Sequence, residues 1–179
     1  MRTQLGAAAL TVALMIGAAP AWAAEPTASE HAVKAAIVYK IAKFVSWPED
    51  SAVSNTDSLR ICLPASDPIG PAMDALAGKT VQGKAIEIRR FEDSTTLTDD
   101  CEILFISKSA ALRRPSLLRN VANAPVLTIG DSDDFADIGG IVMLEIANSR
   151  VQFAINMNAS DRAGLGISAQ LLQLATLLR

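Results

Sequence analysis

The sequence predicts an α/β sandwich, in which helices cover both faces of a largely parallel central sheet and an antiparallel hairpin lies towards the C-terminus. Short apolar runs of strand length, at residues 103–106 and 126–129, alternate with amphipathic helical segments. Such runs, bounded by polar residues, are typical of strands buried on both faces. Two further strand-like runs, at residues 141–146 and 150–155, are joined by three residues and predict the hairpin.

The first helix is expected to begin at residues 27–30, which have the T-x-x-E form of a helix start. Its apolar positions share helical spacing: Val33, Ala36, Ile37, Ile41, Phe44 and Val45. The lysines of this segment fall largely elsewhere and are expected in solvent: Lys34, Lys40 and Lys43. Because Pro48 disfavours a helical residue before it, the helix should end near Ser46 or Trp47.

Strands and helices alternate through the rest of the chain. The patterns predict strands at residues 59–63 and 85–90, with a short helix at residues 69–76 between them. A helix at residues 112–121 then separates the two buried runs named above, which makes a strand, helix, strand unit. Residues 167–178 have apolar residues at helical spacing and predict a terminal helix that packs on the sheet.

The first 23 residues have the pattern of a signal peptide. Arg2 precedes an apolar run over residues 5–19, and a proline and an A-x-A pattern follow at residues 20–23. Because the run is shorter than the roughly 20 residues that cross a bilayer as a helix, we expect cleavage before Ala24. A retained membrane anchor is the alternative. Residues 24–179 are a usual length for one domain.

The charge balance argues against nucleic acid as a partner. The chain has 16 Lys and Arg residues, one of them in the predicted signal peptide, against 19 Asp and Glu residues. It has neither a cluster of five basic residues nor a second apolar segment long enough to span a membrane. We therefore expect the processed chain to bind no nucleic acid and to insert into no membrane.

Cys62 and Cys101 are the only cysteines, and we expect them to form a disulfide. An even number of cysteines in an exported chain favours pairing. Closing a loop of about forty residues would stabilise the fold by roughly 4 kcal/mol in the chain-entropy model. The pairing requires that the strands at residues 59–63 and 103–106 be neighbours. Two buried free thiols are the alternative.

The sequence displays no convincing catalytic or metal-binding constellation. His31 is the only histidine and lies at the first turn of the predicted helix, and there is no G-x-S-x-G motif. Residues 131–137 are acidic, but Ala136 and Val142 stand where a calcium loop needs glycine and glutamate. We expect a solvated loop there, with irregular calcium binding left open, and a protein without enzymatic activity, cofactor or resident metal.

The leading candidate for a partner-binding surface lies at the end of the first helix. Phe44, Trp47 and Pro48 combine aromatic side chains with a rigid proline, and exposed aromatics are frequent anchors of protein interfaces. The alternative is that both aromatics belong to the core. The candidate surface also includes Asp133 and Asp134 of the acidic segment.

Three stretches, taken in order, resemble the YfiR family of periplasmic proteins. They are residues 33–48; residues 101–107 with 125–129, Phe135-Ala136 and Gly139-Gly140; and residues 151–156 with Gly164 and 167–172. The match spans essentially all of residues 24–179. The resemblance implies a single periplasmic α/β domain that binds a membrane-anchored diguanylate cyclase through the cyclase's periplasmic sensory domain. Binding would repress the enzyme and lower cyclic di-GMP.

Other functions stay open beside this regulator hypothesis. Some family members carry an additional cysteine pair near the hairpin, whereas this chain has Ala136 and Met143 in that region, so redox control through that pair does not transfer. The principal alternative is a periplasmic module that binds a small ligand or peptide at the carboxyl ends of the parallel strands. An enzyme is a third alternative, and a homodimer is compatible with the regulator.

Overall fold

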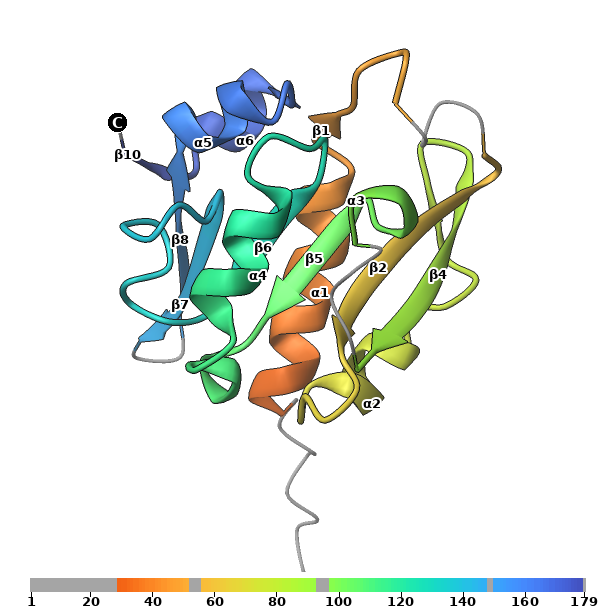
Figure 1. Ribbon diagram of the computed structural model, residues 1–179, viewed down its shortest axis with the longest axis horizontal. Helices are drawn as coiled ribbons and strands as arrows, with labels where there is room; N and C mark the ends of the chain where they lie inside the picture. Colours follow the sequence, from red (N-terminus) through yellow and green to blue (C-terminus); the bar gives the residue numbers. More distant parts are fainter. Residues whose placement is uncertain (1–28, 52–55, 93–96, 148–149, 179) are drawn as a thin grey trace, which may run out of the picture.

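The computed structural model describes residues 29–51, 56–92, 97–147 and 150–178, which form helices, an eight-stranded sheet and a separate two-stranded sheet (Figure 1). The predicted signal peptide, its cleavage site and Thr27 of the predicted helix start lie outside these residues. In the described part of the chain, no helix is long and apolar enough to cross a bilayer.

Helices and strands alternate as predicted. The helices are α1 (Glu30–Ala42), α2 (Gly70–Asp74), α3 (Leu97–Asp100), the 3-10 helix η2 (Lys108–Ala110), α4 (Arg114–Val121), α5 (Met157–Arg162) and α6 (Ala169–Leu172). The strands are β1 (Val45–Ser46), β2 (Ser58–Pro64), β3 (Thr80–Val81), β4 (Lys84–Phe91), β5 (Ile103–Ile106), β6 (Leu127–Gly130), β7 (Val142–Ala147), β8 (Arg150–Asn156), β9 (Gly166–Ile167) and β10 (Thr176–Leu178).

The large sheet has the strand order β10-β8-β7-β6-β5-β2-β4-β3. The strands from β4 to β7 in this order are parallel, whereas β3 runs antiparallel to β4. Strands β7 and β8 form the predicted antiparallel hairpin, and β10 adds beyond β8 in a parallel pairing. The small sheet pairs β1 with β9.

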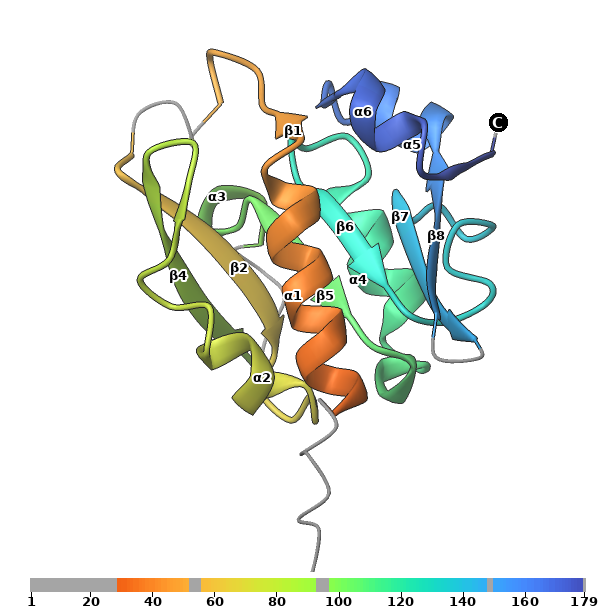
Figure 2. The same cartoon turned by 180° about the vertical axis from the view of Figure 1, so that it is seen from behind.

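Helices cover both faces of the large sheet, as predicted. Along β5, Ile103 and Phe105 pack in the core cluster that includes α1, while Leu104 and Ile106 pack in the cluster that includes α4. This alternation follows from the two-residue period of a strand. Helices α1 and α4 accordingly lie on opposite sides of the sheet, α4 in front in Figure 1 and α1 in front in Figure 2.

The first helix ends earlier than predicted. It begins at Glu30, where the side chain of Ser29 accepts a hydrogen bond from the amide of Ala32, and it ends at Ala42. The predicted end near residues 46–47 is wrong because the backbone of β1 pairs with β9 instead of continuing the helix. A partner some 120 residues away thus decides the local structure, which no local pattern could indicate.

The predicted terminal helix over residues 167–178 is also wrong. Only α6 is helical in this stretch, and it is followed by β10, whose backbone pairs with β8. Leu174, which the predicted apolar stripe would bury, is 76% exposed. The helical spacing of the leucines is therefore not matched by burial, and the unpaired edge of β8 determines the structure of the last residues.

The acidic loop between β6 and β7 is less solvated than predicted. Phe135 in the middle of this loop is fully buried between two glycines. A Cβ atom built on Gly130 would lie 2.3 Å from the Phe135 ring, and one built on Gly140 would lie 2.2 Å from it. The ring therefore requires glycine on either side, and it holds the loop against the sheet.

We expect Gly130→Ala to destabilise the protein by about 1–3 kcal/mol, because the added methyl group would overlap the Phe135 ring. Urea denaturation measures the effect. In a Phe135→Leu background the same substitution should cost less, although the Ile106 carbonyl oxygen, 2.8 Å from the added Cβ, remains an obstacle. If Gly130→Ala lowers the stability equally in the two backgrounds, overlap with the Phe135 ring is not the cause of the loss.

Candidate partner-binding site

The aromatic segment after α1 is held by the small sheet. Val45 pairs with Ile167 and Ser46 with Gly166, and the amide of Ser168 donates to the carbonyl of Phe44 at 2.9 Å. These contacts fix the backbone on both sides of the predicted anchor residues. The backbone of Phe44 therefore has a defined position directly before β1. Figure 1 shows β1 beyond the last turn of α1.

Gln82 secures the same segment from the turn between β3 and β4. Its side-chain Nε2 donates to the carbonyl oxygen of Val45 at 2.8 Å and, more weakly, to that of Ala42 at 3.4 Å. Carbonyl groups at a helix C-terminus lack partners within the helix, so this amide supplies one. Gln82 has a φ of 51°, a conformation uncommon outside glycine, and the turn that requires it aims the side chain at the end of α1.

A groove lies beside this segment. It has a volume of about 290 Å³ and is lined by residues 43–46, Gln82 and residues 166–168, and we call it the β1 groove. The side chain of Phe44, which lines the groove, is 36% exposed, whereas Ile167 on the other strand packs against the main core cluster. The groove thus combines an exposed aromatic side chain with polar backbone from two short strands.

Trp47 differs from Phe44 in its burial. It is half-buried and packs against the main core cluster. Its indole Nε1 is buried and has no hydrogen-bond acceptor among the described residues. A buried donor without an acceptor costs about 1–3 kcal/mol. Of the two aromatics, Phe44 is therefore the more exposed, and Trp47 packs against the core.

At the other end of α1, a buried ion pair joins the helix to the sheet. Lys34 is only 3% exposed, and its Nζ lies 2.6 Å from Oδ2 of Asp131, which follows β6 directly. Lys34 also donates to Glu30, and the amide of Lys108 donates to Oδ1 of Asp131 at 2.5 Å. The prediction that Lys34 faces solvent is wrong, because these carboxylates compensate its charge.

The pKa values of this cluster reflect the pairing. Burial by itself lowers the pKa of Lys34, but the hydrogen bonds that Lys34 donates to Asp131 and Glu30, together with the charges of these carboxylates, outweigh it, so the pKa is raised above its usual 10.5. The hydrogen bond from Lys34 lowers the pKa of Glu30. Both shifts favour the charged forms of Lys34 and Glu30.

The structure does not bring the predicted surface residues together. Asp133 and Asp134 follow Asp131, which contacts Lys34 near the start of α1, whereas Trp47 lies beyond its last turn. At 1.5 Å per residue, the helix from Lys34 to Ala42 alone spans about 12 Å. Trp47 and the two predicted acidic residues therefore lie towards opposite ends of α1.

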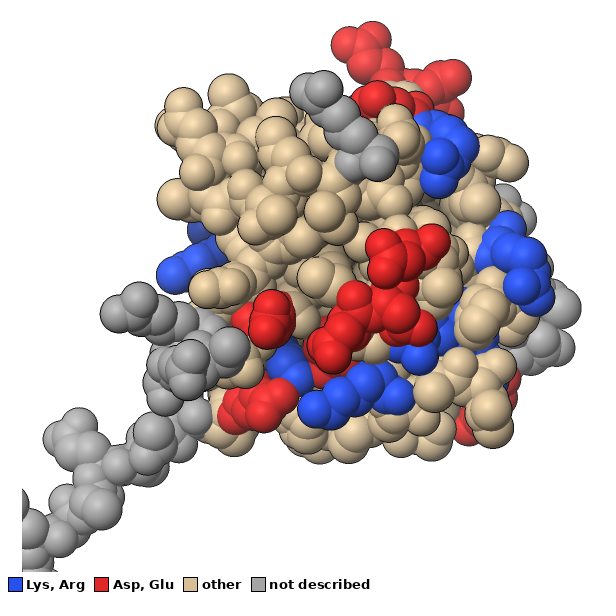
Figure 3. Space-filling view, turned by 90° about the vertical axis from the view of Figure 1, so that its left-hand side faces the viewer, with Lys and Arg blue, Asp and Glu red and all other residues tan. Residues whose placement is uncertain are grey.

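The acidic residues are exposed and partly paired. Asp134 forms an ion pair with Arg114 at 2.9 Å, and Asp133 is exposed. Figure 3 shows one face of the molecule, on which Asp and Glu side chains gather close to Lys and Arg side chains. Among the described residues, no group of three or more Asp, Glu, His or Cys side chains is placed to hold a metal ion.

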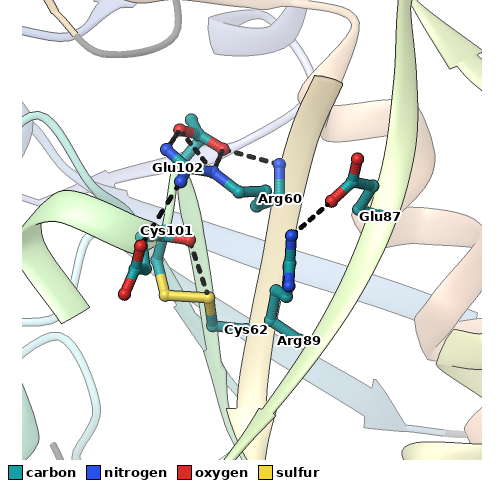
Figure 4. Close-up of a disulfide and its surroundings, with 7 residues drawn as sticks. Arg60, Cys62, Glu87, Arg89, Cys101 and Glu102 are labelled. Atoms are coloured by element: carbon teal, nitrogen blue, oxygen red, sulfur yellow. Dashed lines mark hydrogen bonds and ion pairs between the residues drawn. A yellow bond between two sulfur atoms is a disulfide. The ribbon is translucent and has the colours of Figure 1, made fainter. Parts of the chain in front are cut away.

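The predicted disulfide between Cys62 and Cys101 is present, with the two Cα atoms 5.8 Å apart (Figure 4). Strand β2, which carries Cys62, pairs with β5, which begins just after Cys101, as the prediction required. Beside the disulfide, the buried Glu102 accepts the amide of Arg60 at 2.6 Å and binds its guanidinium group. This hydrogen bonding raises the pKa of Arg60 further.

Sequence reasoning missed the roles of Lys34, Asp131 and Gln82. For Lys34 a signal existed, since it shares a helix face with Val38 and Ile41 at spacings of four and seven residues. Asp131 directly follows a buried strand, which is where polar side chains of a parallel sheet collect. Nothing in the sequence around Gln82 indicates its contact with Val45.

We expect Lys34→Met to destabilise the protein by about 3–5 kcal/mol, because it leaves the carboxylate of Asp131 buried without a counter-charge. Adding Asp131→Asn should restore part of the loss, since no buried charge then remains. Urea denaturation near pH 7 measures both effects. A single variant as stable as the wild type would contradict the assignment.

The same pair predicts a pH dependence with a definite sign. The pKa of Lys34 is raised in the folded state. The charge of Lys34 therefore contributes fully to the free energy of unfolding below the usual lysine pKa of 10.5, and this contribution is lost as the pH rises through the pKa of the folded state. The wild type should therefore lose more stability than Lys34→Met above about pH 10.5.

Replacing both cysteines by alanine should cost up to about 4 kcal/mol, because the disulfide closes a loop of 39 residues in the unfolded chain. Urea denaturation with and without a reductant provides the measurement. Reductant should lower the stability of the wild type and leave the double variant unchanged. A double variant that unfolds at the same urea concentration as the oxidised wild type would rule out this role.

Comparison with solved structures supports the fold. The chain is similar to a conserved domain protein from Vibrio cholerae O1 biovar El Tor, with 12% identity, a TM-score of 0.54, and coverage of 84% of this chain and 60% of that one. It is also similar to an ABC domain from Streptococcus pneumoniae solved in complex with L-Trp, with 13% identity and a TM-score of 0.52.

That second match covers 68% of this chain and 55% of the Streptococcus domain. The chain thus spans somewhat more than half the length of either protein, and at these identities the likeness concerns the fold alone. Comparison with protein-family models assigns the family. The model described as YfiR/HmsC-like matches residues 31–176, which is nearly the whole of the described structure. The chain therefore belongs to the YfiR/HmsC-like family.

Proposed function

We propose that this protein is a periplasmic regulator that binds and represses the periplasmic sensory domain of a membrane-anchored diguanylate cyclase, thereby lowering cyclic di-GMP signalling. The observation that carries the proposal is the family match over residues 31–176. In this proposal residues 1–23 are a signal peptide that is removed before Ala24, and residues 24–179 are one domain.

The proposed mechanism is a binding equilibrium. The regulator stabilises a state of the sensory domain that does not activate the cyclase, so loss of the regulator, or of its folded fraction, releases the enzyme. The regulator then needs a stable, preformed binding surface more than it needs chemistry. The backbone contacts that fix residues 44–46 support such a surface at the β1 groove.

A second candidate function is small-ligand binding. A cavity of about 320 Å³ lies beside the carboxyl ends of β2 and β5, where Asp67 and residues 109–113 line it. Its size falls within the roughly 300–1,000 Å³ of ligand sites, and its place is the one expected for this sheet type. The Streptococcus domain of similar fold was solved with L-Trp, which makes small amphipathic molecules reasonable first probes.

The regulator proposal predicts that the chain captures a diguanylate cyclase. The full-length chain, expressed so that export and processing can occur, is used to pull down partners from detergent-solubilised membranes of its own host. Mass spectrometry should identify a membrane protein with a diguanylate cyclase domain. Deleting the regulator should raise cellular cyclic di-GMP, because the cyclase is then released.

Repeated failure to capture any cyclase, together with unchanged cyclic di-GMP in the deletion strain, would overturn the regulator proposal. A rise in melting temperature with a small molecule, in the absence of other proteins, would then favour the ligand-binding alternative.

A further inference from the structure

An unpaired cluster of lysines borders the β1 groove. Lys40 and Lys43 lie in and just beyond the last turn of α1, and Lys79 precedes β3; all three are exposed. None of them forms an ion pair with a carboxylate among the described residues. We call these three residues the lysine cluster. Other basic side chains of the described part pair with carboxylates, namely Lys34, Arg60, Arg89, Arg90 and Arg114. The three lysines of the cluster thus form a group of uncompensated positive charges in a chain of net negative charge.

Tyr39 holds two of these charges close to each other. The Nζ of Lys43 lies 4.3 Å from the centre of the Tyr39 ring, and that of Lys79 lies 5.8 Å from it. The Tyr39 hydroxyl donates to the carbonyl of Thr80 at 3.2 Å, which ties α1 to the start of β3. Cation–π contacts thus keep two like charges on one ring, although they repel each other.

The lysine cluster and the groove form one surface, because Lys43 belongs to both. Phe44 follows Lys43 directly, and Gln82 binds the backbone carbonyls on either side of these two residues. The surface therefore offers positive charge, an exposed aromatic side chain and a hollow of about 290 Å³. Such a hollow is at the lower limit for a whole small molecule but suits a single anchoring side chain.

We propose that the β1 groove and the lysine cluster bind an acidic segment of a partner protein, with an apolar side chain of that segment in the groove and its carboxylates on Lys40, Lys43 and Lys79. This rests on the proposed function and deepens it, since the segment then belongs to the sensory domain of the cyclase. A partner protein fits better than an anionic membrane, because a concave groove receives a protruding side chain, whereas a bilayer meets protruding surfaces.

The test compares three proteins in the pull-down described above. The test variant is Lys40→Glu, Lys43→Glu and Lys79→Glu, and the matched control is Arg89→Glu, Arg119→Glu and Arg162→Glu, which makes the same change of net charge at exposed positions elsewhere. Urea denaturation of both variants first establishes that they are folded. The test variant should capture at least tenfold less cyclase than the wild type, and the control should capture as much as the wild type.

Salt should weaken capture by the wild type, because it screens charges at an exposed interface. A Phe44→Ala variant, which keeps every charge, should also capture less cyclase. If the lysine variant captures as much as the wild type, the inference fails while the regulator function stands. If the wild type captures no cyclase, both fail. Sedimentation with phosphatidylglycerol vesicles tests membrane binding. If the wild type binds the vesicles and the lysine variant does not, the ligand of the lysine cluster is an anionic membrane and the proposed protein segment is wrong.

Discussion

The position of α1 is the constraint on which the rest of the structure depends, and a buried ion pair sets it. Lys34 and Asp131 meet where the first turn of the helix passes the carboxyl end of β6. Removing two charges from water is costly, so such a pair persists only where the geometry satisfies both groups, as the additional contacts of Glu30 and the Lys108 amide do here. With this end fixed, the length and straightness of the helix determine where residues 43–48 arrive.

The two ends of α1 consequently differ in chemistry. Near the start of the helix, the side chains of Lys34 and Asp131 are buried and their charges compensate one another, which leaves little for a partner to gain. At its end, the Gln82 amide and β9 satisfy the backbone, but Lys40 and Lys43 keep their charges in solvent and Phe44 keeps part of its ring exposed. Internal pairing thus stabilises one end and leaves the other available for binding.

The sequence predicted the elements whose structure is decided locally or by simple burial. The run of residues 103–106 became β5 because four apolar residues with branched or aromatic side chains suit a strand covered on both faces. The predicted end of the first helix was wrong, and the predicted terminal helix was right only over Ala169–Leu172, since β1 and β10 exist only through pairing with distant strands. Secondary structure of two or three residues has no periodicity to detect.

The candidate site was predictable to a similar extent. The sequence singled out Phe44 and Trp47 as aromatics before a proline at the end of the first helix, and the structure leaves part of the Phe44 side chain exposed there. Neither the support of this segment by Gln82 nor its neighbour Lys79 was predicted, because both approach from a hairpin about forty residues further along the chain. The burial of Lys34 was missed for another reason: its charge suggested solvent, although its spacing placed it on the core face.

The strand order has a consequence for how the sheet can be assembled. Once β2, β4 and β5 have formed, each later strand of the large sheet adds to the outside of the last: β6 beside β5, then β7, β8 and finally β10. None of these has to insert between two strands that are already paired. Each of these strands therefore finds its partner among residues that precede it in the sequence. The sheet can grow outward along one edge in the order of the sequence, and its disulfide lies within the part nearer the amino terminus.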